Sequence, residues 1–353
     1  RDQPRSRGLG DVYKRQDFTL ENFIYVDKTE YIPKLVKLKR VFISRPRRFG
    51  KSLTLDTIAT LFETGVEPYF KGTWIYDKWT EPTYPVLRLN FLDLDKYSLD
   101  LFKQKLNSII TAFAQDIKLK DYKEKVEPED TIYFLLDELR KEKRQIVILI
   151  DEYDCQMTAN INNETLYKQF QEKIKSFYAN IKDKFAIKFL GITGVTRLKD
   201  VEIFSIGSDI RDITNASAYS QMIGFTRDEI KKFYIDYLKL AASYENNCSV
   251  DDVTDTQIES LLDRLAQNYD GYCFDEFYKK KVFSTWSVNK FFQSAVSNKF
   301  VYFGEYWYDN GGLPSILVNY LKTHELNSFD YLNKENPITI PVNDFLNPTA
   351  LTT

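Results

Sequence analysis

A short apolar segment that leads through an arginine-rich loop into a helical pattern constrains the fold of this chain more than any other feature. Residues 41–43 are β-branched or aromatic, and residues 44–49 read Ser-Arg-Pro-Arg-Arg-Phe. Gly50 to Ser52 then open an apolar periodicity over residues 53–62, which predicts strand, loop and helix in that order. The start of a helix presents backbone N–H groups and the positive end of its dipole, and it therefore binds phosphate.

The Gly-Lys-Ser tripeptide gives each residue a chemical role in phosphate binding. Gly50 lets the backbone approach the phosphates, an exposed Lys51 reaches the β- and γ-phosphates, and the Ser52 hydroxyl coordinates Mg²⁺. Arg45 stands where the pattern G-x-x-x-x-G-K-S/T has its first glycine, and the tripeptide alone also fits an ordinary helix start with an incidental lysine. The nucleotide is expected on this loop and helix start, at Arg45, Pro46, Arg47, Arg48, Phe49, Gly50, Lys51, Ser52 and Leu53.

Two arginines of the loop allow two interpretations. Arg47 and Arg48 supply cations that could compensate for the missing glycine by contacting phosphate. A solvated basic turn explains them equally well.

A second segment supports the nucleotide interpretation. The aliphatic run Ile146 to Ile150 is typical of a parallel strand covered on both faces, and ligands in such sheets bind at the carboxyl ends of the strands. Asp151 and Glu152 follow the run directly, so Asp151 is expected to support Mg²⁺ and Glu152 to polarise the attacking water. A helix N-cap or a solvated turn is the alternative for this acidic pair.

Further strands and helices alternate along the chain. Strands are predicted at 84–91 and 185–192, and helices at 98–117, 131–142 and 163–181, which together imply a mainly parallel sheet. At the end of the last strand, Thr193 or Thr196 could contact the γ-phosphate or the water, and Arg197 could act as an arginine finger. Strand propensity and turn formation explain the threonines as well, and a surface ion pair explains the arginine.

Composition excludes several classes of protein. The chain has 353 residues, 43% of them hydrophobic and 28% charged, which suits about two globular domains. Its longest purely aliphatic run is far too short to span a bilayer, so no membrane segment is expected. Three scattered cysteines and the single His324 exclude a disulfide framework and a multi-histidine metal site, and a reducing cytoplasm fits best.

The first sixteen residues are expected not to be native. Residues 6–16 read SRGLGDVYKRQ, the translation of a transposase sequencing adapter, and the alternative is a native basic tail. Leaving out residues 1–16 removes five Lys/Arg and two Asp/Glu, so the net charge becomes −5 rather than −2. That balance argues against a broad nucleic-acid-binding face.

Several strings together resemble one known family, the AAA-ATPase-like proteins of bacteria, which are often joined to a C-terminal PD-(D/E)xK nuclease-like domain. The strings are Tyr25-Val26-Asp27-Lys28-Thr29, Ser44 to Leu53, Phe70-Lys71-Gly72, Ile150 to Asp154, Thr193 to Arg197, Tyr269 to Tyr272 and Gly311 to Ser315. R-P-R-R-F-G-K-S is the most specific, and it resembles the family's usual loop with arginine at the first glycine position. The resemblance implies ATP as nucleotide and an α/β P-loop NTPase fold, with an additional-strand parallel sheet of order 5-1-4-3-2 and a helical lid.

The match to the family pattern is incomplete at two places. The chain has Ser-Asp-Ile-Arg at 208–211 where the family has Asn-Asn-Leu before Asp-Ile-Thr, and it has Ser-Thr-Trp-Ser at 284–287 where an Asn-Pro-Trp/Tyr-Ser motif is usual. Both differences concern the lid rather than the phosphate loop. No nuclease constellation of an acid followed by a strand that carries Glu-x-Lys is identified in the sequence.

The expected domains are an artefactual 1–16, a P-loop domain at 17–224 and a helical lid at 225–353. Thr226 with Glu229 predicts a capping box for a helix that runs through Leu240. Further helices are predicted at 254–268, 287–296 and 314–322, and a turn at 269–272.

The sequence thus predicts an ATP-binding P-loop protein whose Mg²⁺-dependent hydrolysis drives a conformational switch in a larger protein. A non-hydrolysing module that uses nucleotide only as a gate is the alternative. A homo-oligomer that lends Arg197 to a neighbouring copy stays open.

Overall fold

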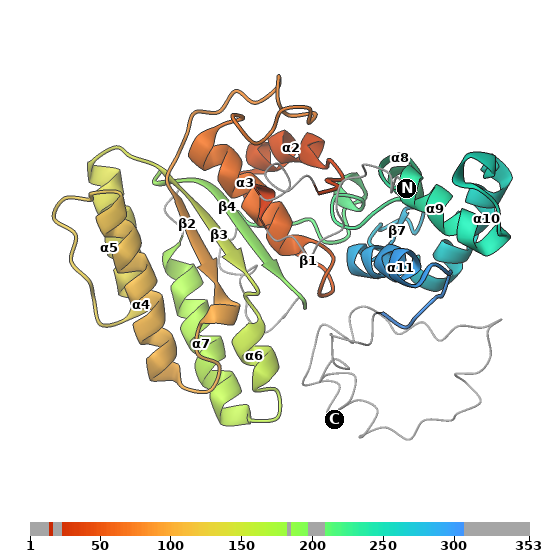
Figure 1. Ribbon diagram of the computed structural model, residues 1–353. Coiled ribbons are helices and arrows are strands. Elements are labelled where there is room, and N and C mark those ends of the chain that lie inside the picture. Colours follow the sequence, from red (N-terminus) through yellow and green to blue (C-terminus); the bar gives the residue numbers. More distant parts are fainter. Residues whose placement is uncertain (1–13, 17–22, 182–184, 197–208, 307–353) are drawn as a thin grey trace. The chain divides into compact units, whose positions relative to one another are not determined.

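The computed structural model describes residues 14–16, 23–181, 185–196 and 209–306 (Figure 1). Its contacts divide the chain into two compact units. Of the described residues, unit 1 contains those up to Tyr84 and those from Asp212 onward, and unit 2 contains those from Pro85 to Arg211. The expected domain boundary near Gly224 stays a prediction.

Unit 2 contains three parallel strands, as predicted. β2 (Val86–Asn90), β3 (Ile146–Asp151) and β4 (Ile187–Gly194) lie in the order β2-β3-β4. All six residues of β3 are buried, which explains its uninterrupted aliphatic sequence. The register places Asn90 beside Asp151, so polar side chains gather where these strands end.

Helices α4 (Leu99–Asp116), α5 (Pro128–Lys141) and α7 (Glu164–Asn180) confirm the three predicted helices of unit 2. They run alongside one another in Figure 1, and each contacts the other two. Ser98 and Asn163 accept a backbone hydrogen bond at the N-cap positions of α4 and α7. The short α6 (Cys155–Ala159), which the sequence did not predict, follows the acidic end of β3.

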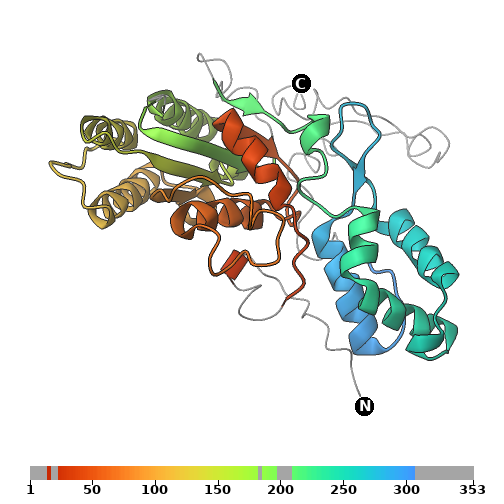
Figure 2. The same cartoon turned by 90° about the horizontal axis from the view of Figure 1, so that it is seen from above.

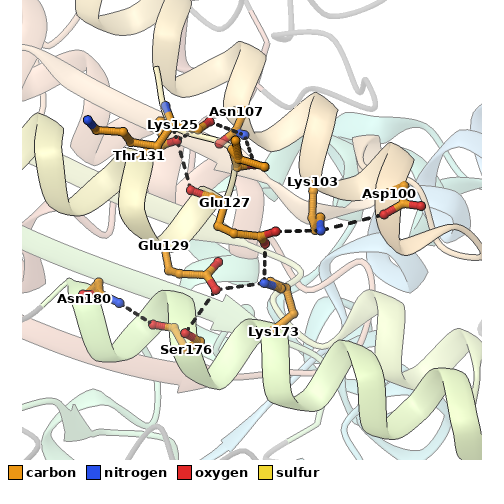
Figure 3. A network of polar contacts seen from close by, with 11 residues as sticks. Asp100, Lys103, Asn107, Lys125, Glu127, Glu129, Thr131, Lys173, Ser176 and Asn180 are labelled. Carbon is orange, nitrogen blue, oxygen red and sulfur yellow. Dashed lines mark hydrogen bonds and ion pairs between the residues drawn. The ribbon is translucent and has the colours of Figure 1, made fainter. Parts of the chain in front are cut away.

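A network of ion pairs connects these three helices (Figure 3). Lys173 of α7 contacts Glu127 at 2.6 Å and Glu129 at 2.8 Å, and Lys103 of α4 contacts Glu127 at 2.9 Å. The two lysines hold the pKa of Glu127 below its usual value through these hydrogen bonds. The charges of Lys103, Lys173, Glu127 and Glu129 pair with one another, so we assign these ion pairs to helix packing.

The N-terminal part of unit 1 contains α2 (Ile32–Leu38), β1 (Arg40–Ser44) and α3 (Lys51–Thr64). The two-residue β5 (Arg211–Asp212) lies next to β1, and the Ile213 N–H donates to the Phe42 carbonyl at 2.9 Å. The pair β5-β1 and the run β4-β3-β2 are the two parts of the predicted order 5-1-4-3-2. The class of fold, mixed α/β with parallel strands, is confirmed.

Four helices form the C-terminal part of unit 1, and Figure 2 shows them packed together. We call α8 to α11, with the hairpin β6-β7 between them, the helical region. Its members are α8 (Arg227–Phe233), α9 (Ile235–Asn246), α10 (Asp255–Tyr269), β6 (Tyr272–Cys273), β7 (Lys281–Val282) and α11 (Thr285–Asn298). Short 3₁₀ turns complete the structure at Thr29–Tyr31, Phe91–Asp93, Ser217–Tyr219 and Val250–Asp252.

The predicted capping box is confirmed, and the length predicted for its helix is wrong. The Thr226 side chain accepts from the Glu229 N–H, and the Glu229 carboxylate accepts from the Thr226 N–H. The helix ends at Phe233 rather than Leu240, because Tyr234 leaves the helical conformation. The Tyr234 ring is buried in the core of the helical region, and its hydroxyl donates to Asn289 at 2.6 Å. The predicted helix at 314–322 lies outside the described residues.

The family string at 25–29 connects distant parts of unit 1. The Asp27 carboxylate accepts from the Thr29 N–H at 2.9 Å and from the Trp74 N–H at 2.6 Å. Lys28 forms an ion pair with Glu229 at 2.6 Å, and burial lowers the pKa of Lys28 while Glu229 opposes that shift. This string therefore has a structural explanation that the sequence did not supply.

Arg15 lies in the segment expected to be an adapter artefact. Arg15 is buried, and its backbone N–H donates to the Asp56 carboxylate at 2.6 Å. Its guanidinium lies over the rings of Tyr25 and Phe70. Whether residues 1–16 are native stays a prediction.

Candidate functional site

The phosphate loop, residues 44–52, connects β1 to α3 within unit 1, as the sequence predicts. Two of its residues have left-handed backbone conformations, Arg48 at φ 65° and Gly50 at φ 103°. No atom lies within 4 Å of a Cβ added at Gly50, so the backbone angle, and not space, requires glycine there. Gly50 is the N-cap of α3, which places the start of this helix at Lys51.

Lys51 occupies the position predicted for a phosphate-binding lysine, but the expectation that it is exposed is wrong. Its side chain is buried, with 3% of the residue exposed, and its Nζ donates to the Pro46 carbonyl at 3.2 Å. The ammonium thus bends back over its own loop, at the end of the helix where phosphate binds most favourably. Ser52 and Leu53 follow in the first turn of α3 and are half-buried.

Arg45 is buried and forms its contacts with other parts of the protein. It is 1% exposed, and its Nη1 donates to the carbonyls of Ser44 at 2.8 Å and Thr214 at 2.7 Å. Its guanidinium lies 4.0 Å from the centre of the Phe274 ring. Burial lowers the pKa of Arg45 to about 9, and nearby Asp212 opposes that shift. The structure therefore uses Arg45 to hold the loop against residues 212–274, and its contact with nucleotide stays a prediction.

The next loop residues contact the helical region. The Phe49 ring is buried and packs edge-on against Tyr272, with ring centres 4.6 Å apart, and against Phe274 at 5.7 Å. The Arg48 carbonyl accepts from the Thr285 hydroxyl at 2.8 Å, and the Arg48 guanidinium lies 3.9 Å from the centre of the Trp286 ring. Pro46 is half-buried and Arg47 is exposed.

The carboxyl end of β3, in unit 2, carries the acidic residues predicted for Mg²⁺ and water. Asp151 is buried, and its Oδ1 accepts from the Thr193 hydroxyl and from the Glu152 N–H. Glu152 is half-buried and has a left-handed backbone at φ 53°, which is uncommon for a residue other than glycine. The Thr193 hydroxyl thus donates to the Asp151 carboxylate, and its contact with the γ-phosphate or the attacking water stays a prediction.

Asp154 fixes the segment after β4 and was not assigned a role from the sequence. It is 1% exposed, and it accepts from the Val195 N–H at 3.2 Å, the Thr196 N–H at 2.8 Å and the Thr196 hydroxyl at 2.6 Å. A Cβ on Gly194 would lie 2.4 Å from the Tyr153 ring and 2.7 Å from the Asp154 carboxylate, so only glycine fits. The Thr196 hydroxyl already has a partner, and its contact with phosphate stays a prediction.

The structure thus groups the predicted residues into two sets, one in each unit. The phosphate loop belongs to unit 1, and Asp151, Glu152, Thr193 and Thr196 belong to unit 2. Arg197 lies outside the described residues. The sequence did not identify three residues that contact the predicted site residues: Asp154, Thr214 and Trp286. Each contacts a residue that is far away in the chain.

The chain belongs to the family described as Predicted AAA-ATPase, whose sequence model matches residues 12–204. It is 30% identical over 241 residues to an uncharacterized protein encoded in the vnfD 5′ region of Azotobacter chroococcum mcd 1. That alignment covers 62% of this chain and 45% of the relative, so the chain spans about half the length of the curated protein it matches. At the level of the family, the match supports a nucleotide-binding protein of the P-loop kind.

Among solved structures, Cdc6p from Pyrobaculum aerophilum matches over 90% of this chain and 75% of its own, at 13% identity and a TM-score of 0.36. A likeness of that size carries no argument about the site.

Two features, a membrane-spanning helix and a metal-binding group of side chains, are absent from the described residues. Within them, no helix is long and apolar enough to cross a membrane. The same residues contain no group of three or more His, Cys, Asp or Glu side chains that could hold a metal ion.

Proposed function

We propose that the protein binds ATP with Mg²⁺ at its phosphate loop and hydrolyses it to drive a conformational switch. The observation that carries the proposal is the loop itself, in which a left-handed Gly50 starts α3 and the Lys51 ammonium lies over the loop backbone. A helix start and a lysine arranged in this way suit a polyphosphate.

The oxygen donors of the chain suit Mg²⁺. Mg²⁺ prefers carboxylate and hydroxyl oxygens and keeps several waters, so the Ser52 hydroxyl and the Asp151 carboxylate are each a suitable kind of ligand. We assign them to the metal on the basis of their positions in the sequence, after β1 and at the end of β3. When bound, the metal neutralises charge that develops on the phosphates.

Glu152 is assigned to the attacking water. Glu152 is half-buried and directly follows Asp151, which we assign to the metal. A carboxylate in that position accepts a proton from water or orients it, which contributes about 10² to 10⁴ in rate. An arginine finger from a neighbouring copy, Arg197 in our assignment, would add to this rate.

A matched pair of measurements tests the proposal. Glu152→Gln keeps the shape of the side chain and removes its charge, so ATP should bind as tightly as in wild type while turnover falls by about 10² or more. Glu164→Gln, an exposed acid at the start of α7, is the control and should turn over at the wild-type rate. Equal turnover in Glu152→Gln and wild type would contradict the assignment.

The second candidate function is a nucleotide-gated module without hydrolysis. The contacts of the phosphate loop with Trp286 and Phe274 favour it, because they connect nucleotide binding to the helical region without any chemistry. Tight ATP binding with no turnover above background in the oligomeric protein would decide for this alternative.

A further inference from the structure

The phosphate loop contacts the helical region through a cation that has two potential partners. We propose that the Arg48 side chain exchanges the Trp286 ring for a nucleotide phosphate, so that Trp286 is the positioning residue that reports occupancy of the loop to α11. The inference rests on the proposed ATP binding and adds a residue that the family match, which ends at residue 204, does not reach.

The geometry shows that the guanidinium of Arg48 is only partly satisfied. Its centre lies 3.9 Å from the centre of the Trp286 ring, which is a close cation–π contact. One of its terminal nitrogens, Nη1, is buried and has no hydrogen-bond partner among the described residues. A buried donor without an acceptor is destabilising, so this arginine gains from any anion that reaches it.

The relative strengths of the two contacts predict which partner is preferred. A single cation–π contact is weaker than a charge-assisted hydrogen bond, and arginine can form two such hydrogen bonds to one phosphate. Trp286 therefore holds Arg48 in the absence of nucleotide, and phosphate displaces the ring when nucleotide is present.

The surrounding contacts keep the exchange local. The Thr285 hydroxyl holds the Arg48 carbonyl at 2.8 Å, and the Phe49 ring is packed against Tyr272 and Phe274, so the loop backbone is fixed. Because Arg48 sits in a left-handed conformation, its backbone already stores the strain of this position. Only the side chain has to move.

Trp286 itself is anchored and remains in place when Arg48 leaves. Its indole N–H donates to the Tyr306 carbonyl at 3.2 Å, and the Lys290 ammonium lies 4.5 Å from its ring centre. The ring lies in the first turn of α11, whose Val288, Phe291 and Phe292 are buried in the core of the helical region. Loss of one of two cations at this ring changes the electric field at the indole and releases one contact between loop and helix.

Arg47 is a natural control within the same loop. It carries the same charge one residue earlier, and it is exposed where Arg48 is half-buried. Truncation of Arg47 removes a loop cation without touching the contact with Trp286. An effect specific to Arg48 therefore reports the exchange and not the net charge of the loop.

Two parallel titrations of the full chain with Mg·ATP test the proposal, one by calorimetry and one by tryptophan emission. The four tryptophans include Trp74, which is exposed and remote from the loop in sequence. We expect wild type and Trp74→Phe to change emission at saturation, and Trp286→Phe to lose that change while still binding ATP. Arg48→Ala should lose the change and bind ATP about 10-fold more weakly, whereas Arg47→Ala should retain the change.

The outcomes separate this inference from the proposed function. ATP binding by calorimetry with an unchanged emission in wild type overturns the exchange and leaves the proposed function intact. An emission change that persists in Trp286→Phe or in Arg48→Ala overturns it equally. No ATP binding by wild type in calorimetry overturns the proposed function and this inference with it. Circular dichroism checks the fold of each variant, and Arg48→Lys provides a second, charge-preserving test if Arg48→Ala fails to fold.

Discussion

The phosphate loop and the carboxyl end of β3 carry opposite charges, and the protein satisfies these charges in different ways. At the end of β3, the buried carboxylates of Asp151 and Asp154 accept hydrogen bonds from the Thr193 hydroxyl and from the backbone and side chain of Thr196. These donors come from β4 and the residues after it, within the same unit. The acidic region is therefore organised before any ligand arrives.

The phosphate loop is organised less completely. Lys51 donates to a loop carbonyl, Arg48 lies over a ring, and both Arg45 Nε and Arg48 Nη1 are buried without hydrogen-bond partners among the described residues. Carbonyls and rings are weaker partners for these cations than phosphate oxygens are. We therefore expect changes at the acidic end mainly to lower the free energy of unfolding, and changes in the loop mainly to weaken ligand binding.

The largest loss of stability is expected at Asp154. Asp154→Ala removes the acceptor of three hydrogen bonds from a site that is 1% exposed, and it leaves the Val195 and Thr196 donors without it. We expect the free energy of unfolding to fall by about 3 kcal/mol, measured by urea denaturation. Glu124, an exposed acid of unit 2, provides the control: Glu124→Ala should change the free energy of unfolding by less than about 0.5 kcal/mol. Equal losses in the two variants would remove the contrast between the two regions.

We expect Asp151 to contribute both to the hydrogen bonding of the acidic end and to ligand binding. Asp151→Asn keeps an oxygen that can accept from Thr193 but removes the anionic oxygen that Mg²⁺ requires. We expect Mg²⁺-dependent ATP binding to weaken at least about 10-fold, while binding without Mg²⁺ is unchanged. Titration of Mg²⁺ at a fixed ATP concentration measures the difference. The same Mg²⁺ dependence in variant and wild type would show that Asp151 has only a structural role.

The smallest effect is expected at Arg47. This side chain is exposed, so its attraction to phosphate is screened by water and salt. Arg47→Ala should weaken ATP binding by about 2- to 5-fold at low salt, and the difference should shrink at high salt. If Arg47→Ala leaves the ATP affinity unchanged at every salt concentration, the alternative interpretation of Arg47 as part of a solvated basic turn is supported.

Local patterns predicted most of the fold. The run Ile146 to Ile150, the strand predicted at 84–91 and the capping box at Thr226 depend on neighbours in sequence, and the structure confirms each of them. The phosphate loop was predictable for the same reason, since strand, loop and helix follow one another directly.

The errors and omissions depend on contacts between residues far apart in sequence. Arg48 and Thr285 are separated by 237 positions, and Arg45 and Thr214 by 169, so no local pattern reveals that the helical region and the segment before it hold the loop. The burial of Lys51 is a local exception: its partner, the Pro46 carbonyl, is only five residues away, but the order strand, loop, helix does not give the path of the loop backbone. The helix break at Tyr234 follows from a buried ring and its bond to Asn289, which periodicity does not record.

Binding of ATP to wild type and to Lys51 variants, measured by calorimetry with Mg²⁺ present, tests the central claim most directly. Lys51→Met removes the charge and keeps most of the buried stem, and Lys71→Met changes an exposed lysine as the control. We predict that wild type and Lys71→Met bind ATP alike, and that Lys51→Met binds at least about 10²-fold more weakly with an unchanged circular dichroism spectrum. Equal ATP affinity in Lys51→Met and wild type would contradict the assignment of this loop as the nucleotide site.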